Sequence, residues 1–93
     1  MSYTRVAVGT TTKGHRVWLQ GTSRYGWPPG TTYTVYYAAD HIVVLRGPTG
    51  RSVTAAKGGI IDLCSKKVSQ SASGHGVAVV GYGENAITIT FEG

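Results

Sequence analysis

Few side chains in this sequence are of the types that carry out catalysis, and their spacing does not group them. The 93 residues include three histidines and a single cysteine. The histidines His15, His41 and His75, with Cys64, lack the short paired spacing of zinc ligands, so we expect no metal site and no cofactor. A catalytic pair of Cys64 and a histidine would need an orienting acid that no sequence neighbour supplies. Cys64 is therefore interpreted as a small core residue.

Other catalytic arrangements are also disfavoured. Asp62 stands alone between Ile61 and Leu63, so no pair of carboxylates is placed for hydrolysis. The glycine-rich segments 74–76 and 81–83 have neither the lysine nor the strand-to-helix setting of a phosphate loop. The chain is therefore not expected to be an enzyme.

The chemistry that the sequence favours is contact with phosphate. Nine Lys and Arg against four Asp and Glu give a net charge of +5 at pH 7. Phosphate binding requires clustered cations, and the cations that flank the first strands or lie on the connecting loop are the candidates: Arg5, Lys13, Arg16, Arg24 and Lys57. The alternative is that a charge of this size only maintains solubility.

Aromatic residues form a second set of candidates. Eight of the nine aromatic side chains are Tyr or Trp, and seven of the nine precede residue 38. Those predicted on an outer strand face or in a loop would stack on bases or on a protein partner: Trp18, Tyr25, Trp27 and Tyr36. The alternative for the Trp27-Pro28-Pro29 cluster is a hydrophobic plug over one end of the fold.

The elements that must position these residues are strands. Short runs of Val, Ile, Thr and Tyr are bounded by Gly, Pro, Asn and Asp, which is typical of β-structure. We expect strands at 5–8, 16–20, 32–38, 42–45, 51–54, 60–63, 76–82 and 86–91. One short, poorly capped helix is expected around 65–72. The expected class is all-β, with one or two short helical turns.

The same composition limits the setting of the chain. Its apolar runs are far shorter than the roughly 20 residues that cross a bilayer, so no membrane partner is expected. The single cysteine cannot form an internal disulfide, and residues 1–5 lead into no apolar signal segment. These features favour a cytoplasmic protein.

The sequence also contains a faint repeat. When the chain is shifted by 44 residues, apolar strand positions, the glycines Gly30 and Gly74, and the acidic hairpin residues coincide. We therefore expect one domain, 1–93, built of pseudo-repeats at about 5–47 and 51–93. The repeat predicts a shared core of Val17, Leu19, Val35, Val43, Leu45, Ile61, Leu63, Val79, Ile87 and Ile89. It also predicts that Gly30→Val costs more stability than Gly50→Val.

Three segments together resemble a known family. They are Arg16-Val17-Trp18-Leu19-Gln20-Gly21, then Trp27-Pro28-Pro29-Gly30-Thr31-Thr32-Tyr33-Thr34-Val35, and then Asp40-His41-Ile42-Val43-Val44. This pattern is similar to the SymE-type toxins and to their wider relatives, the AbrB/MazE swapped-hairpin family. The resemblance implies a small swapped-hairpin β-barrel, here as a fused tandem of two units. Residues 22–26 depart from the family, because they form helices weakly, and we expect a single helical turn there.

The resemblance implies a function as well. Such barrels mostly dock a basic face on DNA, so we expect a nucleic-acid-binding regulator or toxin–antitoxin-like protein of a phage or mobile element, with DNA favoured over RNA. The alternative is a protein-interaction module or inhibitor that uses its Tyr/Trp face. RNA cleavage, by analogy with the toxins, is the least favoured interpretation. A monomeric pseudo-dimer and a homodimer are both open.

Overall fold

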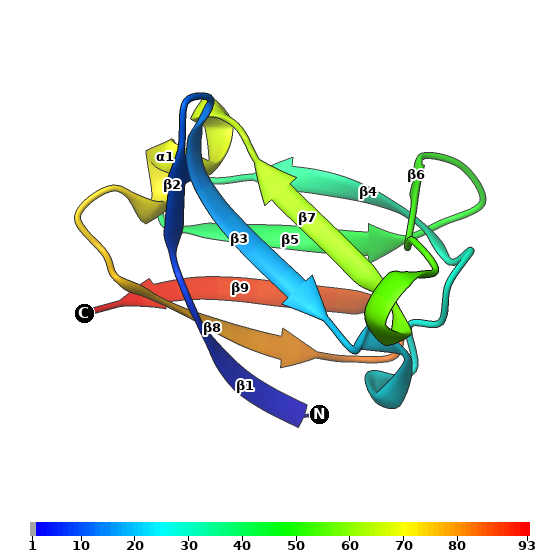
Figure 1. Ribbon diagram of the computed structural model, residues 1–93. Coiled ribbons are helices and arrows are strands. Elements are labelled where there is room, and N and C mark those ends of the chain that lie inside the picture. The colour runs from blue at the N-terminus through cyan, green and yellow to red at the C-terminus, as the bar shows by residue number, and fades with distance from the viewer. Residues whose placement is uncertain (1) are drawn as a thin grey trace.

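The computed structural model describes residues 2–93 and consists mainly of short strands (Figure 1). The strands are β1 Ser2–Ala7, β2 Gly9–Thr11, β3 Gly14–Gln20, β4 Thr32–Tyr37, β5 His41–Arg46, β6 Arg51–Ser52, β7 Ile60–Cys64, β8 Val77–Tyr82 and β9 Ala86–Glu92. The helical segments are the 3-10 turns η1 Thr22–Tyr25 and η2 Ala56–Gly58 and the helix α1 Lys66–Ala72. The predicted all-β class is confirmed.

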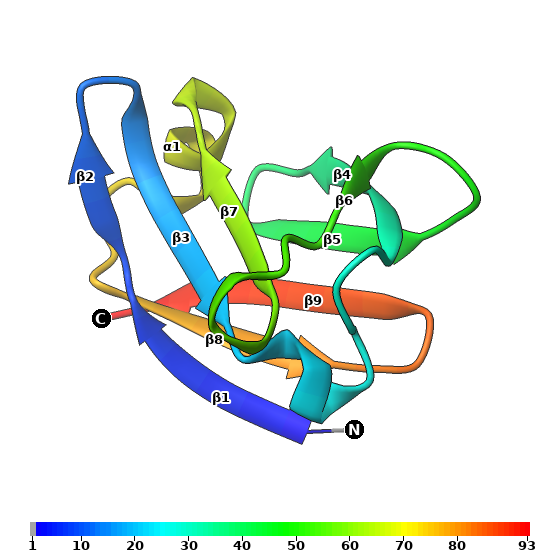
Figure 2. The ribbon, with the colours of Figure 1, turned by 45° about the vertical axis from the view of Figure 1, so that its right-hand side comes forward.

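The strands form two antiparallel sheets that face each other. One has the order β1-β8-β9-β5-β4-β6 and the other β2-β3-β7. Figure 1 shows β3 and β7 crossing in front of the larger sheet. At one side the chain runs from β1 directly into β2 (Figure 2). At the other, the described residues contribute only a single bridge, between Thr54 and Ile60, so the sheets do not close into the expected barrel.

The strand order of the larger sheet is symmetric about its centre when strands about 44 residues apart are treated as equivalent. The central strands β9 and β5 are flanked by β8 and β4, and then by β1 and β6. In the smaller sheet β3 pairs with β7. The first strand of each half lies against the hairpin of the other half, because β1 pairs with β8 and β6 with β4. The two halves therefore complete each other's sheet.

The core lies between the two sheets, and the sequence located its β3 and β7 positions correctly. Six of the ten predicted core residues have no exposed surface: Val17, Leu19, Ile61, Leu63, Ile87 and Ile89. Val35 is partly buried against this cluster. The predictions for Val43, Leu45 and Val79 are wrong, since Leu45 is 40% exposed while Ile42, Val44 and Val80 are fully buried.

A one-residue difference between the halves explains these errors. Buried Val17 and Leu19 match Ile61 and Leu63 at a separation of 44 residues. In the hairpins, however, Tyr37 pairs with Ile42 and Tyr82 with Ile87, which is a separation of 45. Because successive strand residues point to opposite faces, a shift of one residue exchanges the buried and exposed positions.

The two helical segments that follow β3 and β7 differ in length. After β3, the chain makes only the 3-10 turn η1 between Gly21 and Gly26, both with positive φ, which confirms the expected single turn. After β7 comes the predicted helix, α1. Its N-cap is better than the sequence suggested, because the Ser65 hydroxyl accepts hydrogen bonds from the backbone N–H groups of Lys67 and Val68. Within residues 2–93, no helix has the length and apolar character needed to cross a membrane.

Candidate functional site

A groove of about 540 Å³ opens beside the β3–β7 ladder, toward β4. Its wall contains three cations and one carboxylate. The residues that line it are Thr11, Thr12, Lys13, Arg16, Tyr37, Arg51, Asp62, Cys64 and Ser65. They come from β2, the β2–β3 turn, β3, β4, β6, β7 and the N-cap of α1, so segments distant in sequence meet here.

Arg16 and Asp62 form the central ion pair of the groove. In the ladder Arg16 pairs with Cys64 and Asp62 with Trp18, which makes the two charged residues diagonal neighbours on the outer face of the sheet. The Arg16 Nε lies 3.0 Å from Oδ1 of Asp62, and Nη2 lies 3.2 Å from Oδ2. The guanidinium also lies 4.1 Å from the centre of the Trp18 ring. Asp62 therefore compensates the charge of Arg16 and fixes its position.

The other two cations of the groove keep their charge uncompensated. Arg51 donates a 2.8 Å hydrogen bond from Nη2 to the backbone carbonyl of Asp62, not to its carboxylate. Its guanidinium lies 5.7 Å from the centre of the Tyr33 ring. Among residues 2–93, neither Arg51 nor Lys13 is part of an ion pair. The groove is therefore net positive.

The neighbouring groups support this electrostatic description. Burial raises the pKa of the Tyr33 hydroxyl above its ordinary value, whereas the nearby Arg51 acts in the opposite direction. Lys67, at the start of α1, places its Nζ 5.8 Å from the centre of the Tyr37 ring. A fourth positive charge therefore lies at the edge of the groove.

Cys64 lies on the outer face of β7, so its interpretation as a small core residue is wrong. Its Sγ lies 3.0 Å from Thr11 Oγ1, on the half-buried outer side of β7. His15 instead contacts Ser69 through Nδ1 at 2.7 Å. In the described part of the chain, no three His, Cys, Asp or Glu side chains gather as metal ligands.

The five cations singled out in the sequence fall into three places. Lys13 and Arg16 lie in the groove. Arg24 and Lys57 belong to η1 and η2, which meet at the other end of β3, where the Gly21 N–H donates to the Lys57 carbonyl. The paired strands run antiparallel, so Lys13 and Lys57, each near the start of its strand, lie at opposite ends and do not share one patch.

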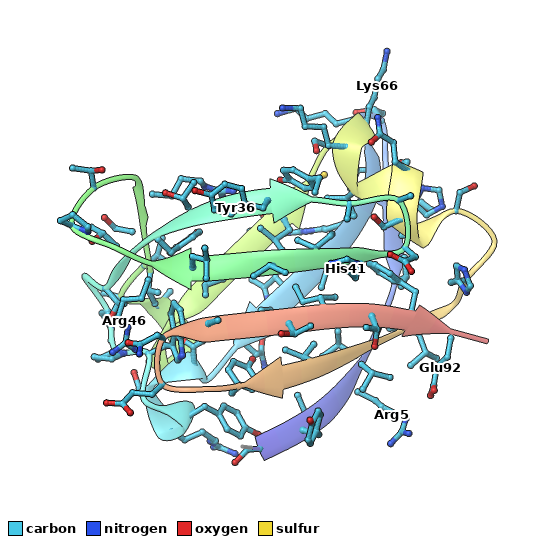
Figure 3. All side chains as sticks on the ribbon, turned by 180° about the vertical axis from the view of Figure 1, so that it is seen from behind. Arg5, Tyr36, His41, Arg46, Lys66 and Glu92 are labelled. Atoms are coloured by element: carbon cyan, nitrogen blue, oxygen red, sulfur yellow. The ribbon has the colours of Figure 1, made fainter. Side chains whose placement is uncertain are left out.

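Arg5 lies on a different sheet from the groove cation Arg16 and from the β2–β3 turn that carries Lys13. It lies on β1, and its Nε is 2.7 Å from Glu92 Oε1 of β9. Figure 3 shows both side chains at the edge of the larger sheet. The hydrogen bond to Glu92 raises the pKa of the Arg5 guanidinium above its ordinary value. Arg5 therefore has a carboxylate partner and lies outside the groove.

Sequence reasoning missed Arg51 and Lys67. Arg51 follows the Gly- and Pro-containing segment 47–50. It reaches the groove because β6 pairs with β4, with Arg51 opposite Tyr33. This β4–β6 pairing joins the two halves of the chain, and no local sequence pattern predicts it. Lys67 could have been found from the helix start at Ser65, had its cap been recognised.

The aromatic residues do not form one face. Trp27 is fully buried, so the plug interpretation is correct and its assignment as a stacking residue is wrong. Trp18 is half-buried on the outer face of the smaller sheet, where its Nε1 donates to Gln20 Oε1 at 3.0 Å. Tyr36 is 54% exposed on the larger sheet (Figure 3). The two residues lie on different sheets.

Tyr25 is already stacked within the protein. Its ring lies 4.2 Å from that of Tyr82, with an angle of 7° between the planes. Tyr82 is only 4% exposed, and burial, with a further contribution from Tyr25, raises the pKa of its hydroxyl to about 12. This stack therefore joins η1 to the end of β8.

The Tyr82 hydroxyl gives the stability of the protein an alkaline limit. In the unfolded chain a tyrosine loses its proton near pH 10, whereas in the folded protein Tyr82 holds it to about pH 12. The contribution of the protonated Tyr82 hydroxyl to the free energy of unfolding is therefore fully present below pH 10 and is lost as the pH rises toward 12. We expect urea unfolding to show wild type losing stability relative to Tyr82→Phe above pH 10. A constant difference between the two proteins from pH 8 to pH 11 would contradict this assignment.

Comparisons with known proteins give no guide to this site: no family model, curated protein or solved structure matches the chain significantly.

Proposed function

We propose that the protein binds nucleic acid, with the phosphate backbone in the groove beside β3 and β7. The observation that carries the proposal is the groove's charge, with Lys13, Arg16 and Arg51 against the single carboxylate of Asp62. Asp62 compensates only Arg16, which leaves Lys13 and Arg51 to contact phosphate. The net charge of +5 adds long-range attraction.

The resemblance to the SymE-type and AbrB/MazE proteins favours DNA over RNA. It also favours a role as a regulator or toxin–antitoxin-like protein of a phage or mobile element. A cytoplasmic location goes with this role and is supported by the single cysteine.

We further propose that the chain is a fused pseudo-dimer of two swapped-hairpin units and acts as a monomer. The symmetric strand order supports this, since β1 and β6 each complete the sheet of the other half. In this proposal one chain supplies both halves that a homodimer would supply from two.

Removing the two free cations of the groove tests the function. Each phosphate contact that is lost reduces the slope of log K against log salt by about one unit. We expect Lys13→Ala with Arg51→Ala to flatten that slope by about two and to weaken binding to all sequences alike. The measurement is fluorescence anisotropy with a labelled 20-nucleotide single strand and a 20-base-pair duplex at several salt concentrations.

The matched control replaces the two exposed cations at the other end of β3, Arg24→Ala with Lys57→Ala. It removes the same charge, so a nonspecific effect of net charge would appear equally in both double variants. A larger loss of affinity in the control than in Lys13→Ala with Arg51→Ala would show that the nucleic acid contacts η1 and η2 and not the groove. If wild type binds neither nucleic acid at 20 mM salt, the proposed function is wrong.

One observation favours a second function, that of a protein-interaction module. The outer face of the larger sheet carries the exposed large hydrophobic residues Tyr3, Tyr36 and Leu45. Tyr3 and Tyr36 lie in one cross-strand row, through Gly81, Thr88 and Val43. Binding of a protein partner there would respond little to salt, which separates it from phosphate binding.

A further inference from the structure

The two hairpins place equivalent tyrosines in different surroundings. Tyr37 pairs with Ile42 at the end of β4, and Tyr82 pairs with Ile87 at the end of β8. Tyr82 is covered by the ring of Tyr25, which comes from the 3-10 turn after β3. The helix after β7 offers Tyr37 no ring and instead places Lys67 5.8 Å from it. Tyr37 stays partly exposed and lines the groove.

The surroundings of Tyr37 define what its ring can accept. The groove volume of about 540 Å³ falls within the range of pockets for small ligands, roughly 300–1,000 Å³. A second hollow of about 250 Å³ continues past Tyr37 along β4 to Gly50 and Arg51. Lys13 and Arg51 add uncompensated positive charge to these walls. A ligand with a planar ring and a negatively charged group beside the ring would match the volume of the groove, the partly exposed ring of Tyr37 and the positive charge of the walls.

We propose that the groove binds single-stranded nucleic acid, with one base stacked on Tyr37 and the adjoining phosphates on Lys13 and Arg51. This inference rests on the proposed function and specifies its substrate. In a duplex, bases are stacked on each other and do not present a free face to a side chain. A single strand does, and stacking on aromatic residues inside a positively charged groove is how such strands are bound without sequence preference. Within the protein, the ring of Tyr25 stacks on the equivalent tyrosine, Tyr82, in the parallel arrangement that a base would adopt on Tyr37.

Removing the ring of Tyr37 tests the inference. We expect wild type to bind a labelled 12-nucleotide deoxythymidine strand about tenfold more tightly than an abasic strand of equal length, because only the first can stack. Tyr37→Leu keeps an apolar side chain and should abolish this difference, whereas Tyr37→Phe should retain it. The control Tyr36→Leu, on the opposite face of β4, should leave it unchanged. Thermal melting by circular dichroism verifies that each variant is folded.

The outcomes separate this inference from the proposed function. Equal wild-type affinity for the thymidine and abasic strands would overturn the stacking on Tyr37 while leaving phosphate binding intact. A difference that persists in Tyr37→Leu would place the base elsewhere and also overturn it. Tighter binding of a duplex than of the single strand would also overturn the stacking of a base on Tyr37. Failure of wild type to bind any of these probes would remove both proposals.

Discussion

Trp27→Ala is expected to lower the free energy of unfolding by about 4 kcal/mol, the usual cost of deleting a large buried aromatic side chain. Trp27 has no exposed surface. Its Nε1 donates a 2.9 Å hydrogen bond to the Gly83 carbonyl in the β8–β9 turn, and the Arg46 guanidinium lies 4.5 Å from the centre of its ring. The side chain therefore joins the loop after η1 to both hairpins.

Backbone contacts hold the same tryptophan in place. Its N–H donates to the Thr22 carbonyl at 3.0 Å, and its carbonyl accepts from the Thr22 hydroxyl at 2.7 Å. Thr22 is itself fully buried. Arg46, whose Nη2 also donates to the Gly26 carbonyl, lies across this end of the fold (Figure 3). Deleting the ring would leave a cavity among groups that cannot easily collapse into it.

The measurement is urea unfolding of Trp27→Ala beside Trp18→Ala and Trp27→Phe. Trp18 is half-buried on an outer sheet face, so its removal should cost less than about 1 kcal/mol. Trp27→Phe keeps a ring but loses the hydrogen bond to Gly83, for an expected cost of about 1.5 kcal/mol. A Trp27→Ala variant as stable as Trp18→Ala would mean that Trp27 is a surface residue, as the stacking hypothesis held.

How far the sequence predicts this fold depends on whether each strand alternates. In β3, apolar Val17 and Leu19 alternate with Arg16, Trp18 and Gln20, and the buried face was identified correctly. The run Ile42-Val43-Val44-Leu45 is apolar throughout, so periodicity cannot choose its face. The choice is made by the pairing with β9, in which Ile42 lies opposite Ile89 and Val44 opposite Ile87.

The candidate site was harder to predict, because it is assembled by pairing between the two halves. Lys13 and Arg16 were found from their positions around one strand. Arg51 enters the groove through the β4–β6 ladder, and Asp62 meets Arg16 through the β3–β7 ladder. Tyr37 was not among the candidate residues, because which tyrosine is covered depends on the unequal helical segments η1 and α1. These are long-range contacts, which propensity and spacing do not encode.

Gly50→Ala is expected to destabilise the protein by about 3 kcal/mol, because a side chain at this position would be strained and obstructed at once. Gly50 has φ +117, and a Cβ there would overlap the Tyr33 carbonyl oxygen and lie 3.2 Å from Thr34 Oγ1. Gly30 also has positive φ, +90, but nothing lies within 4 Å of a Cβ built there. The ranking expected from the sequence, in which Gly30 was the more sensitive glycine, is therefore reversed.

Thermal melting of the two alanine variants measures this difference. Gly30→Ala carries only the cost of the left-handed backbone, about 1 kcal/mol, which in a domain of this size is a fall in Tm of about 5 °C. The corresponding fall for Gly50→Ala is about 15 °C. The reason is topological, since Gly50 immediately precedes β6, and Tyr33 is the β4 residue opposite Arg51. We therefore expect a side chain at Gly50 to push β6 away from β4 and to take Arg51 out of the groove. Equal melting temperatures for the two variants would mean that β6 is not held against β4, and the groove would then lose one of its two uncompensated cations.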